Sequence, residues 1–193
     1  MTAKINNKKV HIPEYVIKNY GPVENEPYYL PAIDISQIDP QFWRQNVYYP
    51  TTHEAGTIII DTDNRHLYYI LGDDQAIRYG IGVGKEGLAL KGTVTISNKR
   101  KWPSWTPTPT MMRRDPDRYG NLGGGLAPGP SNPLGARALY LYRDGHDSLF
   151  RIHGSYEAWS IGQAMSSGCI RMLNHDVIDL YDRVTIGTKV IAI

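Results

Sequence analysis

Residues 57–81, TIIIDTDNRHLYYILGDDQAIRYGI, decide the fold class. Two runs rich in β-branched and aromatic residues, 57–61 and 66–71, flank the polar segment 62–65. A third run, 76–81, follows Gly72 and two aspartates. Isoleucine and tyrosine favour strands, whereas clusters of Asp, Asn and Gly favour turns. The stretch therefore predicts a β-hairpin that continues into a third strand.

Similar short runs recur later in the chain and predict further strands at residues 94–97, 138–142, 149–153 and 189–193. Residues 174–184 have helical spacing instead, with Asn174 as the predicted N-cap and Gly187 just beyond the end. Many short strands with few helices predict a mainly β fold. We expect a sandwich-like or barrel-like core with one or two short helices.

The first 50 residues have a different composition from the rest. Six prolines restrict this part of the backbone, and no periodicity predicts a long element in it. Its eight aromatic residues are more than a disordered tail would carry. We therefore expect an N-terminal extension over residues 1–50, with one short helix at 40–46, packed on a domain formed by residues 51–193.

Residues 98–136 are predicted to form a long loop rich in proline and glycine. A structureless loop of this length is uncommon inside a compact domain unless it has a function. It could form a wall of a ligand cleft, in which Trp102 and Trp105 supply apolar faces. Charge for carboxylates would then come from Lys99, Arg100, Lys101, Arg113 and Arg114. Alternatively, the tryptophans merely anchor a surface excursion to the core, and the sequence leaves both interpretations open.

Composition limits the classes of function. The chain has 193 residues, 41% of them hydrophobic, which is enough for a core of its own. A net charge of +2 is too small to argue for nucleic acid or a membrane surface as a partner. No apolar run approaches the roughly 20 residues of a membrane span, and residues 1–9 lack the apolar core of a secretory signal.

Cys169, the only cysteine, lies in the segment SSGCIRM at 166–172. A thiol attacks as the thiolate, and its ordinary pKa of roughly 8.5 means that it needs an activating group. His153, at the end of a predicted strand, is the first candidate, and Arg171 adds positive charge. Gly168 would let the backbone aim the N–H of Cys169 at an oxyanion. A lone cysteine is more often a small buried hydrophobe, but this polar, glycine-containing setting favours a nucleophile. A single cysteine forms no intrachain disulfide and leaves the compartment open.

Residues 82–87, GVGKEG, match the spacing of a dinucleotide-binding fingerprint. That fingerprint requires a helix directly after its glycines. Here the strand-like residues 91–96 and the proline-containing residues 102–107 follow. We therefore reject nucleotide binding and predict a turn with close backbone packing.

The segment 151–180, RIHGSYEAWSIGQAMSSGCIRMLNHDVIDL, resembles the catalytic signature of the L,D-transpeptidase catalytic domain (YkuD) family of bacterial cell-wall enzymes. The resemblance extends upstream and covers most of residues 50–193. The matching residues are His153, Gly154, Ser166, Gly168, Cys169, Ile170 and Arg171; upstream they are segments 56–61, 78–84, 102–105 and 132–135. The chain departs from the family at Ser167, where many members carry a second histidine, so no role of that histidine is assigned here.

This resemblance implies an L,D-transpeptidase catalytic fold and a cysteine acyltransferase that requires no metal or organic cofactor. Cys169 would attack the third residue of a peptidoglycan stem peptide, and His153, oriented by the Gly154 carbonyl, would move the proton. An amine of a second stem peptide would complete a 3–3 cross-link, with release of D-alanine. Gly168 and Ser167 with Arg171, Trp102 and Trp105 are the candidate oxyanion and substrate residues.

The resemblance also implies a role in cell-wall synthesis and cell shape, a periplasmic or cell-wall location with the signal peptide removed, and a thiol that carbapenems acylate. Three other functions stay open. Water as the acceptor would give a carboxypeptidase or endopeptidase, and an amine of an outer-membrane protein would give attachment of that protein to peptidoglycan. A non-catalytic wall-binding module would have lost its nucleophile, and Cys169 with His153 argues against it.

The remaining histidines are predicted as turn or surface residues, with His175 a solvated residue in the first turn of its helix. The others are His11, His53, His66 and His146. A metal site made of His153, Cys169 and His175 would lack paired ligand spacing and is a weak alternative.

Overall fold

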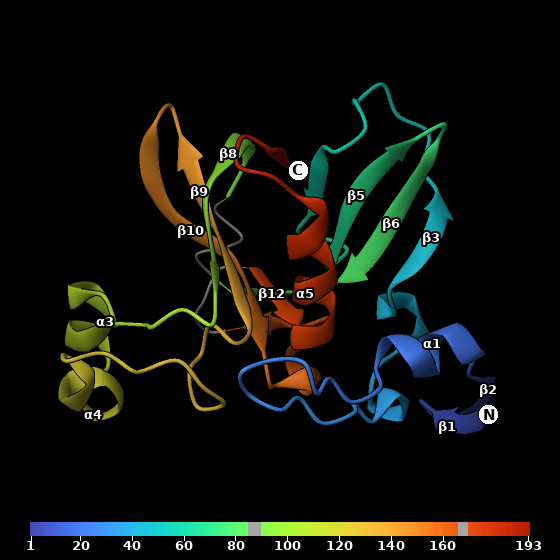
Figure 1. The fold of residues 1–193 in the computed structure, drawn as a ribbon, viewed down its shortest axis with the longest axis horizontal. Helices are drawn as coiled ribbons and strands as arrows, with labels where there is room; N and C mark the ends of the chain where they lie inside the picture. The colour runs from blue at the N-terminus through green and yellow to red at the C-terminus, as the bar shows by residue number, and fades with distance from the viewer. Residues whose placement is uncertain (85–89, 166–169) are drawn as a thin grey trace.

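The computed structural model describes residues 1–84, 90–165 and 170–193. Eleven of its strands form one mixed sheet, in the order β11-β7-β12-β10-β9-β8-β13-β4-β5-β6-β3 (Figure 1). Their bounds are β3 (Gln45–Tyr48), β4 (Ile58–Asp61), β5 (His66–Gly72), β6 (Gln75–Gly80), β7 (Gly82–Gly84), β8 (Gly92–Lys101), β9 (Arg137–Arg143), β10 (His146–Ser155), β11 (Ala164–Met165), β12 (Ile170–Leu173) and β13 (Lys189–Ala192).

The predicted hairpin is confirmed. Strands β4 and β5 pair antiparallel, with Ile58 opposite Tyr69 and Asp61 opposite His66, and β6 pairs with β5. The later strands also form where predicted, but β8 is longer and runs to Lys101. Residues 98–101 are polar or charged, yet their backbone pairs with β9 up to the register Lys101 with Arg137. The predicted loop therefore begins at residue 102 rather than 98.

Helix α5 (Asn174–Arg183) stands between two diverging arms of the sheet in Figure 1. Its Val177 and Leu180 are fully buried in a core that includes Ile58 from one arm and Ile152 from the other. Burial of these side chains supplies the main favourable term for folding. The prediction of a mainly β fold is confirmed, with one sheet supplying both arms.

The N-terminal extension is more ordered than predicted. Strands β1 (Thr2–Ile5) and β2 (Lys8–His11) form a separate hairpin, and helix α1 (Glu14–Asn19) follows. Two 3-10 turns come next, Ile35–Gln37 and Pro40–Phe42. Ile12, Val16 and Trp43 pack in one cluster with Leu173 of β12.

The predicted helix at residues 40–46 is wrong. Only Pro40–Phe42 form a single 3-10 turn, and Gln45–Tyr48 form β3 instead. The open edge of β6 offers hydrogen-bonding partners to this segment, with Gln45 opposite Arg78. Because β3 belongs to the main sheet, the extension and the domain share an element, and a division at residue 50 stays a proposal.

The segment between β8 and β9 was predicted as structureless, and this is also wrong. It contains helices α3 (Pro109–Arg114) and α4 (Pro116–Tyr119), followed by a 3-10 turn at Gly120–Leu122. The side chains of Thr108 and Asp115 cap the two helices by accepting from backbone N–H groups. A proline after each cap fixes the first helical residue, which explains why helices start at these points. In the described ranges, no helix is both long enough and apolar enough to cross a bilayer.

Candidate active site

His153 lies near the end of β10, between two neighbouring strands. It is in register with Ala138 of β9 on one side and with Arg171 of β12 on the other. Its ring is buried, and Nδ1 lies 2.8 Å from the carbonyl oxygen of Gly154. A carbonyl oxygen only accepts hydrogen bonds, so Nδ1 carries the proton and Nε2 keeps a free lone pair. The imidazole is thereby held in the tautomer that can receive a proton at Nε2.

The surroundings of His153 keep it neutral. Burial is the main influence and lowers the pKa of His153; the hydrogen bond with Gly154 opposes it, the nearby charge of Arg171 adds to it, and the resulting pKa is about 4. Removing a charged imidazole from water costs more than one carbonyl contact returns. At neutral pH the side chain is a base rather than a cation.

Both backbone polar groups of Gly154 are hydrogen-bonded. Its N–H donates to the carbonyl of Leu134 over 3.1 Å, and its carbonyl accepts from His153. A Cβ on Gly154 would overlap the Asn174 side chain and lie 3.1 Å from the Ala136 nitrogen. Only glycine therefore fits beside this histidine.

Asn174 was predicted to cap helix α5, and this is wrong. The capping position is Leu173, which provides no side-chain hydrogen bond. The Asn174 Oδ1 instead accepts from the backbone N–H of Ala136 over 2.9 Å, and the residue is buried against Gly135 and Gly154. Asn174 thus ties the helix to the loop that holds the His153–Gly154 pair.

Asn132 organises that loop. Its amide nitrogen donates to the carbonyls of Pro103, over 2.9 Å, and Ala127, over 3.0 Å. Its Oδ1 accepts from the N–H of Leu134 over 2.9 Å, and the carbonyl of Leu134 accepts in turn from the N–H of Gly154. Neither Asn132 nor Asn174 was predicted as a site residue. The segment 132–135, already matched to the family, was the signal that could have found the first of them.

Arg171 faces the same side of the sheet as His153 and forms an ion pair with Glu157, with 2.5 Å between Nη1 and Oε2. Its side chain is largely buried. Glu157 was not predicted as a site residue. A role for Arg171 toward substrate stays a prediction.

Cys169, Ser166, Ser167 and Gly168 lie outside the described residues. Ile170, the residue bonded to Cys169, is described and is the register partner of Ile152, which precedes His153. The two motifs of the sequence therefore meet on adjacent strands, β10 and β12. Within the described ranges, no group of three His, Cys, Asp or Glu side chains could hold a metal ion.

The two tryptophans contact the extension and the loop itself. Trp102 is 6% exposed, its indole N–H donates to Glu26 over 2.7 Å, and its ring lies 4.8 Å from that of Tyr28. Trp105 is half-buried, and its ring lies 6.0 Å from that of Tyr119. These contacts favour an anchoring role for Trp102, and the cleft role of both residues stays a prediction.

Two histidines that were predicted as turn or surface residues are buried in the structure. His66 is buried in β5, with Nε2 placed 3.1 Å from the Gln41 carbonyl. His175 is buried as well, with Nε2 placed 2.8 Å from the Gly21 carbonyl. In both cases the N-terminal extension covers the ring, which a local pattern could not reveal.

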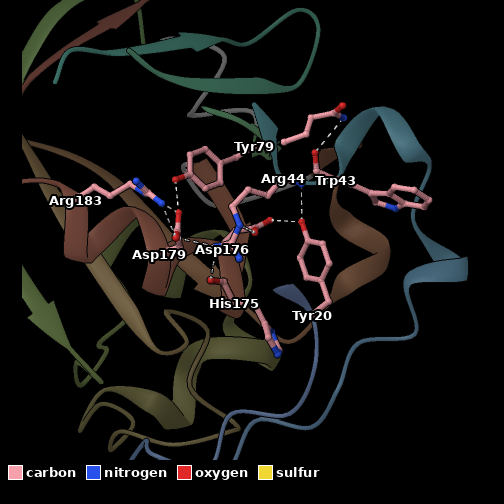
Figure 2. Close-up of polar contacts among 9 residues, drawn as sticks. Tyr20, Trp43, Arg44, Tyr79, His175, Asp176, Asp179 and Arg183 are labelled. Atoms are coloured by element: carbon pink, nitrogen blue, oxygen red, sulfur yellow. Dashed lines mark hydrogen bonds and ion pairs between the residues drawn. The ribbon is translucent and has the colours of Figure 1, made fainter. Parts of the chain in front are cut away.

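A second polar cluster, which we call the extension cluster, lies beside the start of α5 (Figure 2). It consists of Tyr20, Arg44, Tyr79, Asp176, Asp179 and Arg183. The Tyr20 hydroxyl donates to Asp176 over 3.1 Å and accepts from the backbone N–H of Arg44 over 2.7 Å. The Arg44 guanidinium lies 3.8 Å from Asp176 and 3.3 Å from Asp179. Complete burial raises the pKa of Asp176 to about 7 in spite of the arginine.

The glycine pattern at residues 82–87 has a packing role at its first position. A Cβ on Gly82 would overlap the Ser160 carbonyl, so the predicted close packing is confirmed there. Residues 82–84 form strand β7 rather than a turn, and β7 pairs with β12 and β11. Residues 85–87 lie outside the described ranges.

Comparisons with known proteins bear on the family. The family model of the L,D-transpeptidase catalytic domain (YkuD) matches residues 55–191. The probable L,D-transpeptidase ErfK/SrfK of Escherichia coli (strain K12) is 34% identical over 149 residues, 76% of this chain and 46% of that protein. A putative L,D-transpeptidase of Fuscovulum blasticum is 34% identical over 136 residues, 69% of this chain and 67% of that protein. The chain spans about half the length of the Escherichia coli relative.

Two solved structures share the architecture. A probable carnitine operon oxidoreductase from Brucella melitensis is 50% identical, with a TM-score of 0.57, over 80% of this chain and 96% of that chain. An L,D-transpeptidase from Mycobacterium smegmatis is 18% identical, with a TM-score of 0.50, over 71% of this chain and 58% of that chain. The second likeness is one of fold alone.

Proposed function

Because the chain belongs to the L,D-transpeptidase catalytic domain family, we propose that it is a peptidoglycan L,D-transpeptidase that works through a thioester on Cys169. The observation that supports this most is the state of His153. It is buried and oriented through Nδ1 by the Gly154 carbonyl, which leaves Nε2 as the proton acceptor, on the strand beside the one that follows Cys169. A base with its tautomer fixed is what a weakly acidic thiol needs.

In the first half-reaction, the Cys169 sulfur attacks the carbonyl carbon between the diamino acid and the terminal D-alanine of a donor stem peptide. His153 takes the thiol proton on Nε2 and returns it to the departing amine of D-alanine. The C–N bond breaks, D-alanine leaves, and a thioester remains. Backbone N–H groups at Cys169 and Gly168 are proposed to hold the oxyanion, with Ser167 as a further donor.

In the second half-reaction, the side-chain amine of another stem peptide attacks the thioester carbonyl. His153 removes a proton from the attacking amine and returns one to the cysteine sulfur. The product is a 3–3 cross-link and the free thiol. No metal or organic cofactor enters either half-reaction as proposed. We place the reaction in the periplasm or at the cell wall, where peptidoglycan is.

The same thioester permits other acceptors. Water would give a carboxypeptidase or endopeptidase, and an amine of an outer-membrane protein would attach that protein to the wall. We carry over no oxidoreductase activity, because Gly82 and Gly84 of the nucleotide-like glycine pattern lie in strand β7, where Gly82 packs against Ser160.

Mass spectrometry of the products from purified disaccharide-tetrapeptide tests the proposal. A dimer that has lost D-alanine is the expected product, and a monomeric tripeptide alone would assign a hydrolase. Adding an outer-membrane protein with a free amine to the reaction tests for its attachment. Substrate that stays unchanged with the native chain, under conditions where the thiol is free, would overturn the proposal.

A carbapenem offers a test that needs no peptidoglycan. We propose that its strained lactam carbonyl is opened by the Cys169 thiolate. Intact-protein mass spectrometry should show one adduct on the native chain and none on Cys169→Ala. An adduct on the variant would place the reactive group elsewhere.

A further inference from the structure

Strand register places His153 in a row of four side-chain positions across the sheet. Arg100 of β8 is opposite Ala138 of β9, Ala138 is opposite His153 of β10, and His153 is in register with Arg171 of β12. Register partners in paired strands point to the same face. Arg100 and His153 therefore share one face, about 10 Å apart at a strand spacing of about 4.8 Å.

In the structure, the three basic residues Lys99, Arg100 and Lys101 at the end of β8 point to two different faces of the sheet. The Lys99 ammonium donates to the carbonyls of Tyr181 and Val184 on α5, and that of Lys101 lies 5.9 Å from the Tyr181 ring. Both therefore point to the face of β8 that α5 covers. Arg100 points to the opposite face, the one that carries His153.

The other arginines on this face already have carboxylate partners. Arg151 forms a bidentate ion pair with Asp147, and Arg171 pairs with Glu157. Arg100 is exposed, and within the described ranges its guanidinium has no hydrogen-bond or ion-pair partner. It is therefore the cation of this row that is free to receive an anion.

Arg100 also lines a groove of about 520 Å³. Its lining includes Tyr140 and Tyr142 of β9, Trp102 and Ser104 beyond the end of β8, and Asp147, whose carboxylate is paired with Arg151. It is open and polar, with aromatic faces against which an extended peptide can pack. The groove lies on the face of the sheet that carries His153, and Arg100 belongs both to its lining and to the row that contains His153.

We propose that this groove binds the donor stem peptide and that Arg100 recognises the free α-carboxylate of its γ-linked D-glutamate, the residue before the diamino acid. This inference rests on the proposed function. About seven covalent bonds, at most about 9 Å, separate that carboxylate from the reacting carbonyl. This length fits the spacing between Arg100 and His153, and a guanidinium can bind a carboxylate through two parallel hydrogen bonds.

The test uses two disaccharide-tetrapeptide donors that differ in one group: the free α-carboxylate of D-isoglutamate, or its amide in D-isoglutamine. The native chain should use the acid with a kcat/KM about tenfold higher than that of the amide, because a charge-assisted bond is lost. Arg100→Gln should lose about tenfold on the acid and little on the amide, so the preference disappears. Arg143→Gln, which removes the same charge from β9 at a position on the opposite face, should keep the native preference.

The outcomes separate this inference from the proposed function. Turnover of both donors at equal kcat/KM by the native chain would overturn the role of Arg100 and leave the transpeptidase assignment intact. An Arg100→Gln variant that still prefers the acid would do the same. No turnover of either donor by the native chain would instead overturn the proposed function. The rate of Cys169 alkylation by iodoacetamide should be unchanged in Arg100→Gln, which shows that the thiol and its base are intact.

Discussion

Two polar clusters meet at the first turn of α5, and they differ in the kind of partner that their hydrogen bonds use. The first surrounds His153, and its hydrogen bonds run to backbone groups at Gly154, Leu134 and Ala136. The second is the extension cluster, whose bonds run between charged and phenolic side chains such as Arg44 and Asp176. Backbone partners fix one geometry and one protonation state, whereas charged partners make the contact depend on pH.

Consecutive residues of one helix serve the two clusters. Asn174 contacts the His153 side, while His175 and Asp176 contact the extension through Gly21 and Tyr20. Successive residues of an α-helix project about 100° apart, so a first turn can face two directions within three residues. The comparison predicts that changes in the first cluster affect chemistry, and that changes in the second affect stability.

The largest effect is expected at the nucleophile. Cys169→Ala should abolish cross-linking and acyl-enzyme formation, because alanine has no group that can form the thioester. The melting temperature should stay close to that of the native chain. Measurable cross-linking by the purified variant would contradict the assignment of Cys169.

His153→Ala should slow acylation by about 10²- to 10⁴-fold, because the thiol loses its proton acceptor. The measurement is the rate of iodoacetamide alkylation of Cys169 between pH 5 and 10. We expect the profile to shift toward that of an unassisted thiol, near its ordinary pKa of roughly 8.5. An identical profile in variant and native chain would make His153 a structural residue.

Trp102→Ala should cost about 3–5 kcal/mol in the free energy of unfolding, because a buried indole is removed and the Glu26 hydrogen bond is lost. Trp105→Ala, at a half-buried site, is the matched control and should cost less. If either indole lines the donor cleft, kcat/KM per folded molecule falls as well. Normal activity per folded molecule in both variants would show that the two residues only anchor the loop and do not contact the substrate.

Asp176→Ala should lower the free energy of unfolding by about 1–3 kcal/mol, because Tyr20 and Arg44 lose a buried partner while Arg44 keeps Asp179. Asp176→Asn, which retains a hydrogen-bond acceptor for Tyr20, should cost less. Alkylation of Cys169 should be unaffected in either variant. Slower alkylation would show that the two clusters are coupled.

The two clusters should also differ in how their stability depends on pH. The buried groups Asp176 and His153 change the free energy of unfolding in opposite directions as pH rises. The folded-state pKa of Asp176 is raised to about 7 from an ordinary value of 3.8, so its contribution to stability is complete at low pH and is lost as pH rises through about 7. The folded-state pKa of His153 is lowered from 6.5 to about 4. Its contribution to stability is therefore complete above pH 6.5 and is lost as pH falls toward 4. Urea unfolding at several pH values should show Asp176→Asn gaining stability relative to the native chain as pH rises from 4 to 8. A constant difference would refute the raised pKa.

Local patterns predicted much of the fold. The hairpin at 57–81 and helix α5 depend on signals within each segment, namely strand-forming runs, polar turns and helical spacing. Helices α3 and α4 were missed although Thr108-Pro109 and Asp115-Pro116 are local start signals. Proline interrupts a helix in its interior but favours its first position, so these prolines start helices here.

Features that depend on distant partners could not be predicted in this way. Strand β3 forms because β6 has a free edge, and Asn174 turns from the expected cap to Ala136, which lies 38 residues earlier. The burial of His66 and His175 depends on how the extension folds back over the domain. By contrast, the contact between His153 and Gly154 was expected from the family resemblance. It joins adjacent residues and needs no distant partner.

The place of β13 in the sheet sets an order of events during folding. Among the described strands, β13 is the link between the arm that begins with β8 and the arm that begins with β4, and its Val190 is in register with both Val94 and Ile58. A ribosome must therefore release residues 189–192 before the arms can join, although each arm's hairpins can form earlier. Contacts that span so much of the chain close slowly, and until then both unpaired edges are open to aggregation. Folding of this domain is thus expected to finish only after these residues have been synthesised.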